Sequence, residues 1–122
     1  MKIEKIAKGH VVSVSVSTSA KVAMKLLEDS NLSLAPVLEE GRLVGIITQD
    51  QLKEKTTENA TVKSIMQKPL FVEKEKSIDY AIKYLINHRI NRVPVVESEI
   101  GMRCVGIVTA SELLKAKKLM QQ

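Results

Sequence analysis

The chain has 122 residues, of which 44% are hydrophobic and 2% aromatic, with a formal net charge of +5. This length suits one compact module with an aliphatic core, and so few aromatic side chains disfavour a stacking surface for single-stranded nucleic acid. The single cysteine, Cys104, excludes an intrachain disulfide, and the longest apolar runs fall far short of the roughly 20 residues that span a bilayer. We therefore expect a soluble, cytoplasmic protein without a membrane partner.

The first half of the chain predicts a strand, a helix, two further strands and a second helix. Valine and serine alternate over 12–16, which is typical of a strand. Ser19 can then cap a helix over about 20–30, whose apolar residues share one face. A strand is predicted at 35–38, a glycine turn at Gly41 and a further strand over 43–48. That strand ends at Thr48, the N-cap of a helix that begins at Gln49.

The polar segment 53–61, KEKTTENAT, lacks apolar periodicity and is the predicted connector. After it the same order of elements returns. A strand is predicted at 70–72, and Ser77 can cap a helix over 78–88. A strand is predicted at 93–96, a glycine turn at Gly101 and a further strand over 102–109. That strand ends at Thr109, the N-cap of a helix that begins at Ala110.

The two halves of the chain repeat the same motifs. Pro36 and Pro94 each begin Pro-Val-apolar-Glu at an offset of 58 positions (94 minus 36). Thr48 and Thr109 each end Gly-Ile-apolar-Thr at an offset of 61 (109 minus 48), and the extra residues fall in the turn, where insertions are tolerated. One copy of about sixty residues is marginal alone, so we expect the copies to pack together. The predicted fold class is α/β (α+β), with two β-α-β-β-α repeats, 1–55 and 56–122, forming one pseudo-twofold module.

These motifs, together with the Thr-x-x-acid segment from Thr109 to Glu112, resemble the CBS domain family, and the resemblance covers nearly the whole chain. It implies a stand-alone tandem CBS pair (a Bateman module) that acts as a regulatory sensor. In such pairs each of two clefts takes Thr-x-x-acid from one repeat and strand residues from the other. The implied ligands are AMP, ADP, ATP or S-adenosylmethionine, none of them a required cofactor. The implied partners are a second copy in a homodimer and an unidentified effector protein.

Carried onto this sequence, the resemblance implies two unequal clefts. The stronger cleft would combine a polar helix start with an apolar wall, formed by Thr109, Ser111, Glu112, Val12, Leu32 and Leu34. The weaker cleft, where Gln51 stands in place of the acid, would use Thr48, Asp50, Ile90 and Arg92. Glu112 is one methylene longer than the family's usual Asp, and Arg92 stands where phosphate is often contacted. A carboxylate one turn into a helix can accept ribose hydroxyls, and a helix start favours phosphate.

The same residues also have purely structural interpretations. Thr48 and Thr109 can serve only as N-caps, Glu112 can complement the helix dipole, and Arg92 can be a surface residue. Gln51 favours a second hypothesis, a protein-interaction or oligomerisation module with degenerate clefts. The positive charge leaves nucleic-acid binding as a third, which the lack of a basic cluster beside aromatic residues disfavours. Because the sequence shows no catalytic constellation, phosphate-binding glycine loop or metal-ligand spacing, we expect neither an enzyme nor a metal site.

Overall fold

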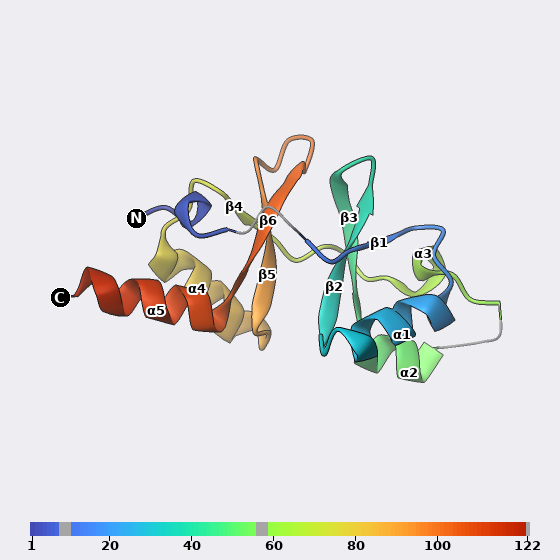
Figure 1. Cartoon of the computed structure of the whole chain (residues 1–122). Helices are drawn as coiled ribbons and strands as arrows, with labels where there is room; N and C mark the ends of the chain where they lie inside the picture. Colours follow the sequence, from blue (N-terminus) through green and yellow to red (C-terminus); the bar gives the residue numbers. More distant parts are fainter. Residues whose placement is uncertain (8–10, 56–58, 122) are drawn as a thin grey trace. The chain divides into compact units, whose positions relative to one another are not determined.

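The computed structural model describes residues 1–7, 11–55 and 59–121, and it divides into two compact units (Figure 1). One unit is Val12–Pro69, and the other joins Met1–Val11 to Leu70–Gln122. Each unit contains a three-stranded mixed sheet and its own helices, with the same order of elements. The predicted α+β class and the repeated β-α-β-β-α order are therefore confirmed.

The elements of the Val12–Pro69 unit are β1 (Val14–Ser15), α1 (Ala20–Asp29), β2 (Leu34–Glu39), β3 (Arg42–Thr48), α2 (Gln49–Lys55) and α3 (Val62–Ile65). The central strand β2 pairs parallel with β1 and antiparallel with β3. Glu40 and Gly41 form the tight turn between β2 and β3, both with positive φ. Ser19 caps α1 as predicted, because its hydroxyl accepts a hydrogen bond from Val22 N–H at 3.1 Å.

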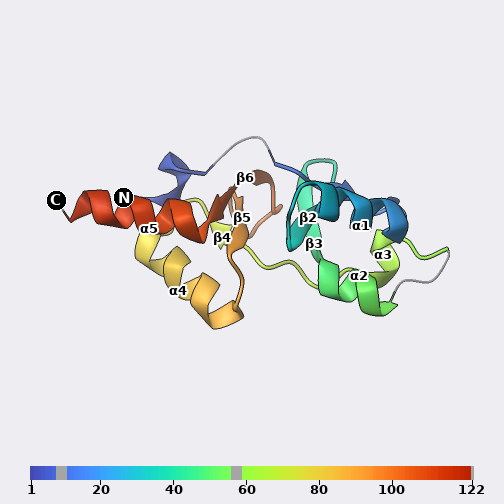
Figure 2. The same ribbon diagram turned by 60° about the horizontal axis from the view of Figure 1, so that its bottom comes forward.

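The elements of the other unit are η1 (Ile3–Lys5), β4 (Val72–Glu73), α4 (Ile78–His88), β5 (Arg92–Val96), β6 (Cys104–Thr109) and α5 (Ala110–Met120). The central strand β5 pairs parallel with β4 and antiparallel with β6. Ser77 caps α4 by accepting from Tyr80 N–H at 3.1 Å, and α4 ends at His88, followed by the C-cap Arg89 in a left-handed conformation. Helices α4 and α5 lie side by side (Figure 2).

Each unit has its own aliphatic core, as the composition predicts. Equivalent positions of the two repeats fill the two cores, so that α1 or α4 packs its apolar face on the sheet. Examples are Leu27, Val37 and Ile47 in one unit and Leu85, Val95 and Val108 in the other. All six are at most 3% exposed, so the duplicated motifs specify two similar interiors.

The outer strands are shorter than the sequence predicts. The strand expected over 12–16 is confined to β1, because Ser15 N–H donates to the Thr18 hydroxyl at 3.1 Å and turns the chain. The strand expected over 70–72 shifts to β4, because Phe71 N–H donates to the Tyr84 hydroxyl at 3.1 Å instead of joining a sheet. The strand expected over 102–109 begins at Cys104, after a turn that contains Met102 in a positive-φ conformation.

The opening segments of the two sequence repeats are exchanged: Met1–Val11 joins the unit that contains Leu70–Gln122, and α3 belongs to the Val12–Pro69 unit. In one unit Ile3 is fully buried and its N–H donates to Lys76 O at 3.0 Å. In the other, Val62 is fully buried and its N–H donates to Thr18 O at 2.8 Å. The compact units therefore differ in membership from the two sequence repeats, 1–55 and 56–122, whose boundaries stay a prediction.

The connector predicted at 53–61 is only partly a connector. Residues 53–55 continue α2, and 56–58 lie outside the described part of the chain. Ala60 O already accepts a hydrogen bond from Ala20 N–H at 2.9 Å. The polar composition of this segment gives no sign that it contains the end of α2 and the residues that precede α3.

Candidate functional site

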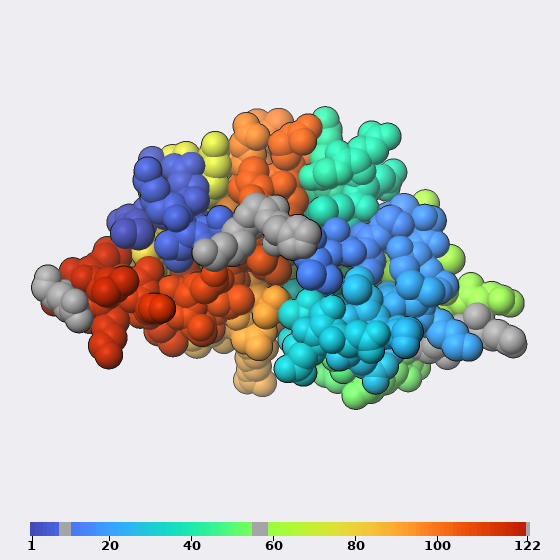
Figure 3. Space-filling view, viewed as in Figure 1, coloured from blue at the N-terminus to red at the C-terminus, as the bar shows by residue number. Residues whose placement is uncertain are grey.

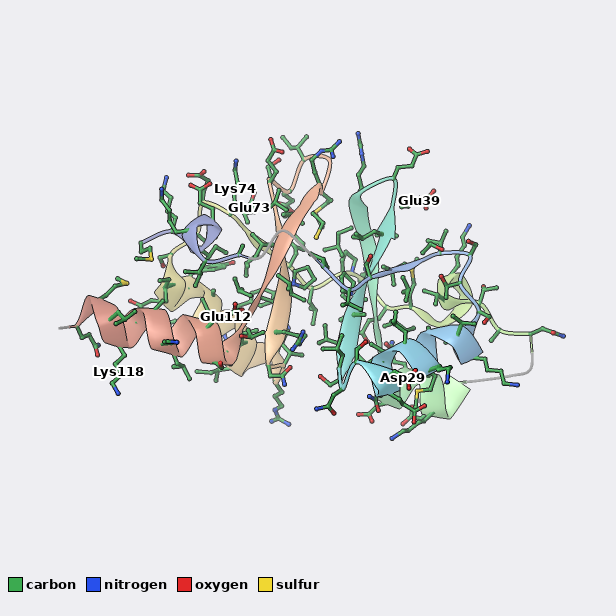
Figure 4. The ribbon with its side chains drawn as sticks, in the orientation of Figure 1. Asp29, Glu39, Glu73, Lys74, Glu112 and Lys118 are labelled. Carbon is green, nitrogen blue, oxygen red and sulfur yellow. The ribbon has the colours of Figure 1, made fainter. Side chains whose placement is uncertain are left out.

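Thr109 and Glu112 form a capping box where β6 meets α5 (Figure 4). The Thr109 hydroxyl accepts from Glu112 N–H at 3.2 Å. Glu112 Oε1 accepts from the Thr109 N–H and from the Thr109 hydroxyl, each at 3.0 Å. The threonine therefore caps the helix, as its structural interpretation predicts, while Glu112 uses only one of its two carboxylate oxygens in the box.

Thr48 and Gln51 form the same arrangement at the start of α2. Gln51 Oε1 accepts from the Thr48 N–H at 3.0 Å and from its hydroxyl at 3.2 Å, and Gln51 N–H donates to that hydroxyl at 3.1 Å. The Gln51 amide also donates to Gln67 Oε1 at 2.9 Å. An uncharged amide thus performs the capping role of Glu112, so the charge at residue 112 is not needed for the cap.

A cavity of about 330 Å³ lies beside Glu112. It is lined by residues of η1, the adjoining Ile6 and one face of α5: Lys5, Ile6, Glu112, Lys115, Ala116 and Leu119. In Figure 3 the blue surface of η1 lies close to the red surface of α5. The lining therefore combines one acidic residue, two lysines and three apolar residues.

The other residues predicted for the stronger cleft lie in different surroundings. Ser111 is exposed in the first turn of α5. Val12 is 37% exposed, whereas Leu34 is only 2% exposed. Leu32 packs against the core of the Val12–Pro69 unit. The grouping of these apolar residues with Glu112 in one cleft stays a prediction.

The residues predicted for the weaker cleft divide between the two units. Leu34 is the register partner of Thr48 on β2 and β3, and Arg92 is the register partner of Thr109 on β5 and β6. Ile90 packs against the core of its own unit, and Asp50 is exposed on α2. The register thus places the backbone of Arg92 beside that of Thr109, while the grouping of Arg92 with Thr48 stays a prediction.

Sequence reasoning did not identify Lys5 and Lys115 as site residues. Lys115 follows Glu112 by one helical turn, but scattered lysines on a helix face are usually solvated. Lys5 reaches the site only because Met1–Val11 joins the second compact unit. No sequence signal shows that docking.

A second cavity, about 260 Å³ in volume, is an apolar groove between α4 and α5. Its lining residues are Ile82, Leu85, Ile86, Arg89, Ile90, Ala110 and Leu114. Ile86 is 69% exposed and Leu114 is 57% exposed. We call this surface the α4–α5 groove.

The single thiol of the chain, Cys104, lies in β6 and is partly buried. Burial raises the pKa of the Cys104 thiol, and its S–H donates to Gly106 O at 3.5 Å. The group is therefore a protonated thiol near neutral pH. Over residues 1–7, 11–55 and 59–121, no three His, Cys, Asp or Glu side chains gather in a way that could hold a metal ion. None of the described helices is long and apolar enough to cross a membrane.

Comparison with known proteins places this architecture in a family. The chain matches the CBS domain family over residues 3–56 and 62–119. Inosine-5'-monophosphate dehydrogenase of Methanocaldococcus jannaschii is 30% identical over 122 residues, which cover 98% of this chain and 24% of that protein. The chain thus spans about a quarter of the length of that relative.

Two solved structures have the same fold. The CBS domain pair of protein MJ0100, in complex with 5-methylthioadenosine and S-adenosyl-L-methionine, superimposes with a TM-score of 0.78 at 24% identity, covering 98% of both chains. CBSX2 of Arabidopsis thaliana, in complex with AMP, gives a TM-score of 0.82 at 23% identity and covers 99% of this chain and 98% of its own. The match over both repeats and the shared architecture show that the chain belongs to the CBS domain family, with two CBS domains in tandem.

Proposed function

We propose that this chain is a regulatory module that binds an adenosyl ligand (AMP, ADP, ATP or S-adenosylmethionine) beside Glu112 and signals to an effector protein in the cytoplasm. The observation that carries the proposal is the dual position of Glu112. One of its oxygens closes the capping box, and the same side chain lines the cavity of about 330 Å³. A carboxylate placed in this way can accept hydrogen bonds from ribose hydroxyls. The adenosyl ligands bound by MJ0100 and CBSX2 support this ligand class.

The ligand would be held by the polar start of α5 and by an apolar wall. Ser111 offers a hydroxyl at the helix start, where the helix dipole favours negative charge. The Thr109 hydroxyl already donates its proton to Glu112 and can only accept a further bond. Val12, Leu32 and Leu34 are the residues proposed for the wall against adenine. Of these three, Val12 has a substantial exposed surface.

We propose that the second site, at Thr48, Asp50, Ile90 and Arg92, binds weakly or stays empty. Gln51 has no negative charge, and its amide is already bonded to Gln67 at 2.9 Å. Asp50 is exposed beside it and does not take part in the capping box. The expected stoichiometry is one ligand per chain.

Calorimetric titration of the whole chain with AMP, ATP and S-adenosylmethionine tests the proposal. We expect saturable heat for at least one of them, with weaker binding in Glu112→Ala and unchanged binding in the control Glu54→Ala. Glu54 is a suitable control because it is an exposed acid on α2 of the other repeat and belongs to neither proposed site. If none of the three ligands gives heat or a thermal shift at millimolar concentration, the proposed function is excluded.

We also propose that two copies associate through the α4–α5 groove. Ile86 and Leu114 are exposed beside an apolar hollow, so one surface offers both protruding and receiving groups, as a two-fold interface requires. At the corresponding positions, the first repeat has the exposed polar residues Glu28 and Lys53. The apolar surface is therefore particular to the second repeat.

Signalling requires that the ligand bind two states of the module with different affinity. In this proposal the effector reads that change and the module itself has no catalytic role. The sequence similarity to the dehydrogenase covers 24% of that protein, which fits a regulatory part better than a whole enzyme.

A second candidate function is a protein-interaction or oligomerisation module whose clefts have lost their ligands. The uncharged Gln51 and the apolar α4–α5 groove favour it. The two functions differ in one result, because only the sensor loses a measurable ligand affinity when Glu112 is replaced.

A further inference from the structure

We infer that the site at Glu112 prefers anionic adenine nucleotides to S-adenosylmethionine, because Lys5 and Lys115 give the cavity a net positive charge. The inference rests on the proposed function and specifies its ligand class. Two lysines and one acidic residue, Glu112, line the cavity. Fixed positive charge in a concave site attracts phosphate and repels cationic ligands.

The two lysines come from different elements, which distinguishes them from an ordinary solvated helix face. Lys115 lies one turn after Glu112 on α5. Lys5 belongs to η1, which the fully buried Ile3 and its hydrogen bond to Lys76 O hold in the same unit. Their convergence on one cavity is therefore a product of the tertiary structure.

Within the described residues, neither lysine forms an ion pair with a carboxylate. The ion pairs found in the described part of the chain are Lys2 with Glu75, Lys25 with Asp29 and Lys117 with Asp79. Lys117, only two positions after Lys115, is bonded to Asp79 at 2.7 Å. The positive charge of Lys5 and Lys115 thus remains available to a ligand.

The other repeat provides an internal comparison. The bridges of Lys2 with Ser77 and of Thr61 with Ser19 align η1 with α3, so that Lys5 corresponds to Ser64. Glu112 corresponds to Gln51, and Lys115 corresponds to Glu54. The equivalent set in the Val12–Pro69 unit therefore carries a net negative charge. Since the fold is shared and the charges are reversed, the lysines are specific to the Glu112 site.

The candidate ligands differ in charge at the same end of the adenosyl group. AMP, ADP and ATP carry negative phosphates there. S-Adenosylmethionine carries a sulfonium and an ammonium against a single carboxylate, and 5-methylthioadenosine has no charge. Two unpaired lysines favour the first group, disfavour S-adenosylmethionine and leave 5-methylthioadenosine unaffected.

The test is a set of calorimetric titrations of the whole chain with ATP, AMP, 5-methylthioadenosine and S-adenosylmethionine at fixed ionic strength. We expect ATP and AMP to bind more tightly than S-adenosylmethionine. Lys5→Gln and Lys115→Gln should each weaken ATP binding by about fivefold, which is the upper range for an exposed ion pair. Neither change should alter the affinity for 5-methylthioadenosine. Lys118→Gln is the matched control, because Lys118 is on α5 but does not line the cavity.

Three results would overturn the inference. The first is equal or tighter binding of S-adenosylmethionine relative to ATP in the unmodified chain. The second is the same loss of ATP affinity in Lys118→Gln as in Lys115→Gln, and the third is unchanged ATP affinity in both cavity variants. All three leave the proposed function intact, whereas the lack of binding of all four ligands would refute the proposed function itself.

Discussion

Replacing Glu112 by glutamine separates its structural role from its role toward a ligand. Gln51 shows within the same chain that an amide oxygen accepts both bonds from its threonine, at 3.0 and 3.2 Å, compared with 3.0 and 3.0 Å for Glu112. Glu112→Gln should therefore keep the capping box and lose only the interaction of the charge with the helix dipole, about 0.5 kcal/mol. Glu112→Ala removes the box and should cost about 1 kcal/mol, or roughly 4 °C in melting temperature.

Glu112→Gln should weaken ligand binding much more than it lowers the stability of the fold. Hydrogen bonds to a charged acceptor contribute about 1.5–3 kcal/mol, so adenosyl affinity should fall by roughly ten- to a hundredfold. Scanning calorimetry gives the stability and titration calorimetry with AMP gives the affinity. If Glu112→Gln is as unstable as Glu112→Ala, the capping argument is wrong, and if it binds AMP as tightly as the unmodified chain, the carboxylate does not contact the ligand.

Four further predictions follow from packing and charge. Gly45→Val should destabilise the chain by about 1–3 kcal/mol in urea unfolding, because even a Cβ at this position would be 2.7 Å from Met66 Sδ and 2.9 Å from Gln67 O. An unchanged unfolding midpoint would show that the segment containing Met66 and Gln67 moves away freely. Ile3→Ala removes a fully buried side chain and should cost about 2–4 kcal/mol by the same assay, whereas a loss below about 0.5 kcal/mol would contradict the docking of η1. Ile86→Lys with Leu114→Lys should convert the proposed dimer to a monomer in light scattering while the far-UV circular dichroism is kept, because like charges meet across a two-fold interface. A dimer that survives both changes would place the interface elsewhere. Cys104 should react with a thiol reagent at pH 8 more slowly than free cysteine, because burial raises its pKa and leaves little thiolate, and an equal rate would contradict the described burial.

The acid stability of the chain should reflect one exposed ion pair. The Lys117 ammonium, through its hydrogen bond and its charge, holds the pKa of Asp79 below its ordinary value. A carboxylate with a lowered pKa stabilises the folded state above its unfolded pKa, and this contribution is lost as the pH falls through the folded value. Lys117→Gln should therefore flatten the fall in melting temperature at acidic pH at low salt, and the difference should shrink as salt is added.

The elements set by local chemistry were predictable from the sequence. Ser19 and Ser77 begin α1 and α4 at the expected positions, because an N-cap serine acts on a backbone N–H only three residues away. The lengths of β1 and β4 were not predictable. The length of β4 depends on the hydrogen bond from Phe71 N–H to the Tyr84 hydroxyl, whose partner lies in α4, and the length of β1 depends on the bond from Ser15 N–H to the Thr18 hydroxyl. Neither bond has a periodic signal in the sequence.

The candidate site was likewise only partly predictable from the sequence. The segment from Thr109 to Glu112 was identified because its spacing places donor and acceptor in one helical turn. Lys5 was not identified, because its position depends on the docking of Met1–Val11 beside residues that follow it by more than sixty positions. The duplicated motifs predict the scaffold, whereas the charges of the site arise from differences between the copies.

Native mass spectrometry of the freshly purified chain tests most directly whether the module is a sensor of adenine nucleotides. We expect a bound mass equal to one AMP, ADP or ATP per chain, either present on purification or gained after incubation with the nucleotide. An unliganded mass that persists in millimolar AMP, ATP and S-adenosylmethionine would contradict the account.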